Sequence, residues 1–135
     1  MITITDKMIE GGTRDELGKK IAELKRDIAS RFPRILVFED ARTVDFNYCV
    51  IKAQLDVIEF LEYYLLGSKE RNWLCAVYPH THQKNKVVTV RDFKAIIEDA
   101  KQMILSKQPH DVRYNSIYFT VLYFLNRIEV KEDGT

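Results

Sequence analysis

The chain has 135 residues, of which 46% are apolar, 11% aromatic and 30% charged. This length is typical of one domain, and the apolar content is enough to build a hydrophobic core without a disulfide or a metal. The 21 basic and 20 acidic residues leave a formal net charge of +1, so no overall field favours nucleic acid or a membrane surface. We therefore expect a single compact domain over residues 1–135, with any function encoded in local features.

Sequence features favour a cytoplasmic protein. The first residues do not show the basic segment and apolar stretch of a signal peptide. The longest run of aromatic and aliphatic residues, 117–125, is far shorter than the roughly 20 residues that span a bilayer. Cys49 and Cys75 both lie in apolar runs, which favours two buried thiols in a reducing compartment, with a disulfide as the alternative. We expect no association with membranes.

The first third of the chain indicates a strand, a helix and a second strand. Residues 2–5 (ITIT) alternate β-branched side chains, which is typical of a short strand. A capping box, TRDE, opens a predicted helix over about residues 13–32, and Pro33 ends it. The mostly apolar run at residues 34–38 (RILVF) favours a buried strand that could pair with the first one.

The segment that organises the rest is a long helix at about residues 43–66. Apolar residues recur at helical spacing in two neighbouring rows, so the apolar stripe covers much of the helix circumference. We expect Thr43 or Asp45 to cap its N-terminus, and Gly67 to end it in the left-handed conformation that glycine adopts readily. Such a helix must be covered in water, so we expect the other elements to pack around it.

The following segment predicts a β-hairpin and then a helix. Two β-like runs, residues 73–78 and 86–90, flank a polar loop at residues 79–85. A variant capping box, TVRD, opens a predicted helix over about residues 90–107, which ends before Pro109. We therefore expect a hairpin directly before this helix.

The last element is predicted as a helix over about residues 111–128. Its apolar residues follow helical spacing, but the run SIYFTVLYFL would equally suit a buried strand by propensity, and length decides for the helix. The polar residues 131–135 are expected to fray. In total we expect an α+β, mainly helical single domain of about four helices, with a β-hairpin and one or two further short strands.

Aromatic residues are the first candidate for function. The last predicted helix carries more aromatic side chains than one small interior needs, unless this helix is covered on all sides. We therefore predict a contact surface on it, formed by Tyr114, Tyr118, Phe119 and Tyr123. The first function hypothesis is a small non-enzymatic interaction module, an adaptor, inhibitor or subunit, that self-associates as a homo-oligomer and binds another protein.

The predicted hairpin loop is the second candidate. Six basic and two acidic residues fall between residues 67 and 94, a local charge of +4. The alternative function is therefore binding of an anionic ligand, either nucleic acid or a small nucleotide, through loop residues 79–91. The structural alternative is a solvated loop whose lysines keep the hairpin soluble. The candidate ligand-binding residues of this loop are His80, His82, Lys84, Lys86 and Arg91.

No sequence pattern indicates catalysis or a metal site. His80 and His82 superficially resemble the paired metal ligands of HUH nucleases, but Thr81 replaces the large apolar residue between them. The pair also lies in a predicted loop, and no tyrosine is marked out as a nucleophile. Three carboxylates on the central helix are expected to form a solvated face: Asp56, Glu59 and Glu62. The five glycines form neither a P-loop nor a dinucleotide fingerprint, and we predict no catalytic residue, metal or cofactor.

Overall fold

The computed structural model describes residues 2–11, 14–35, 41–77, 89–107 and 115–131. These residues are mainly helical, with one small sheet, which confirms the α+β expectation at this level. In chain order the elements are β1 (Ile2–Thr5), α1 (Asp6–Glu10), α2 (Arg14–Ala29), α3 (Phe32–Ile35), α4 (Ala41–Leu66), the 3-10 helix η1 (Trp73–Val77), α5 (Val90–Lys107), α6 (Asn115–Asn126) and β2 (Ile128–Lys131).

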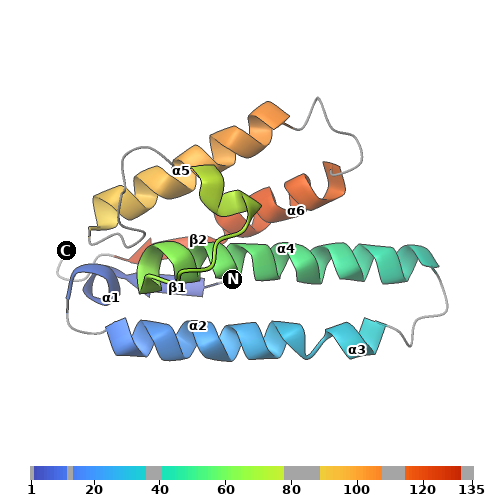
Figure 1. The fold of residues 1–135 in the computed structure, drawn as a ribbon, viewed down its shortest axis with the longest axis horizontal. Coiled ribbons are helices and arrows are strands. Elements are labelled where there is room, and N and C mark those ends of the chain that lie inside the picture. The colour runs from blue at the N-terminus through green and yellow to red at the C-terminus, as the bar shows by residue number, and fades with distance from the viewer. Residues whose placement is uncertain (1, 12–13, 36–40, 78–88, 108–114, 132–135) are drawn as a thin grey trace.

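Helix α4 is the centre of the packing, as the sequence predicts. Figure 1 shows α4 between α2 on one side and α6 on the other, with α5 beyond α6. Phe60, Leu61 and Tyr64 of α4 are fully buried, because neighbouring elements cover several sides of the helix. None of the helices in the described ranges is both long and apolar enough to cross a membrane.

The two ends of α4 differ in how well the sequence predicts them. The helix begins at Ala41, so Thr43 and Asp45 lie inside it and the predicted N-terminal cap at either residue is wrong. At the other end Gly67 has a φ of 74°, which confirms the left-handed conformation. The amide of Ser68 then donates to the carbonyl of Glu62 at 3.1 Å, which turns the chain back along the helix.

The small sheet pairs the two ends of the described chain. β1 lies parallel to β2, with Ile2 opposite Ile128 and Ile4 opposite Val130. The predicted strand at residues 2–5 is confirmed, but pairing it with residues 34–38 is wrong, because residues 34–35 belong to helix α3. The predicted helix over residues 13–32 ends earlier, at Ala29, so its predicted end at Pro33 is wrong. Pro33 lies in the first turn of α3, where the missing amide hydrogen breaks no helical hydrogen bond. Residues 36–38 of the predicted strand lie outside the described residues.

The segment predicted as the first arm of a hairpin is helical instead. Residues 73–77 form η1, and the Asn72 side-chain oxygen accepts hydrogen bonds from the amides of Leu74 at 3.0 Å and Cys75 at 3.3 Å. These local bonds favour a turn over extended backbone. Residues 78–88 of the predicted hairpin lie outside the described residues, and Val90, the last residue of its predicted second arm, belongs to α5.

Helices α5 and α6 follow the prediction to different degrees. α5 has the predicted bounds, 90–107, and the Thr89 hydroxyl caps it by accepting from the Asp92 amide at 3.1 Å. Helix rather than strand is also correct for residues 115–126. The predicted end of this helix at residue 128 is wrong, because Ile128 already belongs to β2. Lys131, expected in a frayed tail, is the last residue of that strand.

Candidate functional site

Two exposed aromatic side chains lie on the solvent side of α6. Phe119 is 57% exposed and Tyr123 is 55% exposed, and a spacing of four residues places them on one helix face. The guanidinium carbon of Arg127 lies 5.6 Å from the centre of the Tyr123 ring, within the range of a cation–π contact. We call Phe119, Tyr123 and Arg127 the α6 face. Val121 and Leu125 are buried on the other side, so α6 contributes to the core without these two rings.

The other two residues of the predicted aromatic surface do not join the α6 face. Tyr118 is half-buried, and its ring centre lies 5.6 Å from that of Trp73 in η1. Tyr118 therefore points toward η1. Phe119, the next residue, points elsewhere, because residues adjacent along a helix point about 100° apart. Tyr114 lies outside the described residues. Of the four predicted interface residues, the structure therefore brings Phe119 and Tyr123 together.

A surface cavity of about 890 Å³ adjoins the α6 face at Arg127, which is one of its lining residues. Inside the cavity, the Lys20 ammonium donates to the Thr3 carbonyl at 3.1 Å, and the Thr3 hydroxyl lies 3.4 Å from a carboxylate oxygen of Glu129. Two basic and two acidic side chains line this space, so it has no net preference for a small anion. The lining residues are Ile2, Thr3, Lys20, Glu23, Leu24, Asn126, Arg127, Ile128 and Glu129.

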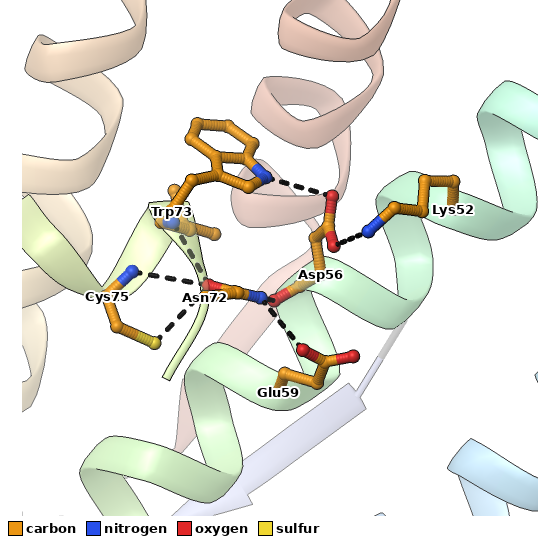
Figure 2. Close-up of polar contacts among 7 residues, drawn as sticks. Lys52, Asp56, Glu59, Asn72, Trp73 and Cys75 are labelled. Carbon is orange, nitrogen blue, oxygen red and sulfur yellow. Dashed lines mark hydrogen bonds and ion pairs between the residues drawn. The ribbon is translucent and has the colours of Figure 1, made fainter. Parts of the chain in front are cut away.

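A buried carboxylate on α4 is a further feature that the sequence pattern misassigns. Asp56 is only 1% exposed, whereas the row of carboxylates on this helix was expected to be solvated. One carboxylate oxygen lies 2.5 Å from the Lys52 ammonium, and the other accepts from the Trp73 indole nitrogen at 3.0 Å (Figure 2). Burial lowers the pKa of Lys52, but the hydrogen bond and charge of Asp56 outweigh burial, so this pKa is raised.

Asn72 completes this cluster and fixes η1 on α4. Its amide nitrogen donates to the backbone carbonyl of Asp56 at 2.9 Å and lies 3.4 Å from a carboxylate oxygen of Glu59. The Tyr64 hydroxyl donates to the carbonyl of Cys75 at 2.7 Å, and burial raises the pKa of the Cys75 thiol to about 11. A protonated, buried thiol is a poor nucleophile. Since the polar atoms of the cluster hold one another, the arrangement favours a structural role over a catalytic one.

No local signal in the sequence identifies this cluster. Asp56 and Lys52 have the spacing of an ordinary surface pair on a helix, and Asn72 lies in a connection beyond Gly67. The contacts arise only when the chain folds back along α4. The sequence indicates such contacts only through the single tryptophan of the chain, Trp73, because an indole nitrogen needs a hydrogen-bond partner when it is buried.

The alternative, anion-binding site lies almost entirely outside the described residues. This applies to His80, His82, Lys84 and Lys86, while Arg91 is exposed in the first turn of α5. The anion-binding hypothesis therefore stays a hypothesis. In the described segments, no three His, Cys, Asp or Glu side chains are grouped as a metal site requires.

Comparison with protein-family models, with curated proteins and with solved structures gives no match for this chain.

Proposed function

We propose that the protein is a non-enzymatic interaction module whose α6 face docks onto a second polypeptide, with another copy of this chain as its first partner. The observation that carries this proposal is the pair of more than half-exposed rings, Phe119 and Tyr123, on one face of α6. Aromatic residues with an adjacent arginine are enriched where proteins bind one another, because they combine apolar area with polar contacts.

The energy available from this surface is enough for weak to moderate association. Completing the burial of a half-exposed ring contributes roughly 1 kcal/mol, since full burial of such a side chain contributes about 1.5–3 kcal/mol. A two-fold interface would bring four such rings together, two from each copy. Arg127 at the rim can keep its cation–π contact with Tyr123 while facing acidic groups of the partner.

Other exposed apolar side chains form a weaker candidate surface. Phe46 on α4 is 68% exposed, and Leu105 is exposed near the end of α5. Tyr48 is also exposed but already packs against Phe32, with ring centres 6.0 Å apart. The α6 face is favoured because Arg127 contacts the exposed Tyr123 ring and also lines the cavity.

Sedimentation velocity over a concentration series tests the proposal. We expect the chain to self-associate, and the combined substitutions Phe119→Ala and Tyr123→Ala to raise the dissociation constant at least about tenfold. Phe46→Ala is the control, since it removes a phenylalanine that is even more exposed, 68% against 57% for Phe119, from another helix, and it should leave association unchanged. Equal effects of the α6 variant and the control would refute the assignment to the α6 face.

A further inference from the structure

Strand β2 is the more open of the two strands in the sheet. On β1, the side chains of Ile2 and Ile4 are buried, and Lys20 of α2 donates to the carbonyl of Thr3 at 3.1 Å. On β2, Val130 is only half-buried. Among the described residues the sheet has these two strands alone, so each has one side without a neighbouring strand. A strand edge carries backbone groups that can pair with another strand, and two strands alone form a marginal sheet.

The side chains of β2 complement a second β2 in one antiparallel register. Glu129 and Lys131 are both exposed and project from the same face of the strand, two residues apart. A two-fold axis at Val130 places Glu129 of each copy opposite Lys131 of the other. Two ion pairs form across the axis, and opposite charges directly across two strands are stabilising.

Neighbouring registers lack this match. An axis at Glu129 places the two glutamates opposite each other, and an axis at Lys131 places the two lysines opposite each other, which is repulsive in both cases. A shift by one residue would put the charged face of one strand on the same side of the sheet as the apolar face of the other strand. Ile128 and Val130 on that apolar face pack toward the core, so this register is unfavourable. Of the three axes at Glu129, Val130 and Lys131, only the one at Val130 places opposite charges across the two strands.

We propose that two copies of the chain join through antiparallel pairing of their β2 strands about Val130, which extends the two-stranded sheet to four strands. The order becomes β1, β2, β2 of the second copy and β1 of the second copy. Backbone hydrogen bonds supply affinity in such strand addition, and the alternating side chains supply register. This surface is distinct from the α6 face, so the inference stands even if Phe119 and Tyr123 do not contribute to self-association.

Charge reversal with complementation tests the register directly. Glu129→Lys leaves two lysines in each strand, and Lys131→Glu leaves two glutamates, so each variant alone should self-associate at least about tenfold more weakly. An equimolar mixture of the two should restore wild-type affinity as a heterodimer, because each lysine then faces a glutamate. Glu98→Lys, an exposed charge reversal on α5, is the control for a general effect of charge.

Native mass spectrometry with one variant labelled with nitrogen-15 distinguishes homodimers from heterodimers. Dominant heterodimers in the mixture, together with weakened homodimers of each variant and an unaffected control, are the expected result. A monomeric wild type at hundreds of micromolar, single variants that dimerise as well as the wild type, or a mixture without preferred heterodimers would each overturn the inference. A monomeric wild type would also overturn the proposed self-association through the α6 face. Single variants that dimerise as well as the wild type would overturn this inference alone, because they leave Phe119 and Tyr123 intact.

Discussion

Removal of the buried carboxylate at Asp56 should destabilise the fold strongly. In Asp56→Ala, the indole nitrogen of Trp73 loses an ionised acceptor at 3.0 Å in a place that water reaches poorly. Lys52 loses its partner as well, but its side chain is 40% exposed and can turn toward water. The hydrogen bond from Asn72 to the backbone carbonyl at this position does not depend on the side chain and should persist.

The expected loss of unfolding free energy is about 2–3 kcal/mol. A hydrogen bond to a charged group contributes about 1.5–3 kcal/mol when its removal leaves a buried donor unpaired. The ion pair with Lys52 adds only about 0.3–0.5 kcal/mol, because one partner is solvated and the two lie one helical turn apart. Asp56→Asn retains an oxygen for Trp73 and should lose roughly half as much.

Urea unfolding monitored by the fluorescence of the single tryptophan measures this loss at the site itself. With a urea dependence of about 1–3 kcal/mol per molar, the midpoint for Asp56→Ala should fall by roughly 0.7–3 M. Asp45→Ala, which removes an exposed carboxylate from the same helix, should change stability by less than about 0.5 kcal/mol. If Asp56→Ala behaved like Asp45→Ala, the carboxylate would not hold η1 on α4.

Three further predictions concern glycines and thiols. Gly67→Ala should cost about 1–2 kcal/mol because the φ of 74° strains any side chain, whereas Gly18→Ala should stabilise the chain by about 0.5–1 kcal/mol. An added methyl group at Gly18 would lie 4.0 Å from Leu66, an ordinary contact, and thermal unfolding of both variants tests the opposite signs. A thiol reagent at pH 8 should modify the half-buried Cys49 well before Cys75, whose pKa of about 11 leaves roughly one thiolate per thousand; equal rates would contradict this. Since the pKa of Cys75 is raised in the folded state from its usual 9.0, its contribution to stability is complete below pH 9 and is lost as pH rises toward 11. Cys75→Ala should flatten the stability profile in that range.

The sequence by itself determined the elements that local interactions control. The central helix follows from apolar periodicity, and its end follows from Gly67, because few other residues adopt a positive φ. Helix α5 follows from a cap at Thr89 that needs only the next three residues. The strand at residues 2–5 follows from alternation of β-branched side chains. The exposed aromatic pair was anticipated as an excess of rings over the space in one small interior.

Only the tertiary structure decided the features that depend on distant contacts. The partner of β1 lies at the other end of the chain, and no local pattern prefers residues 128–131 over residues 34–38. Asp56 is buried because η1 folds back onto α4, although its spacing alone suits a solvated face. Contact with Trp73 likewise separates Tyr118 from its exposed neighbour Phe119. Periodicity sets which face of a segment can be apolar, whereas packing against remote segments determines which of those faces is covered.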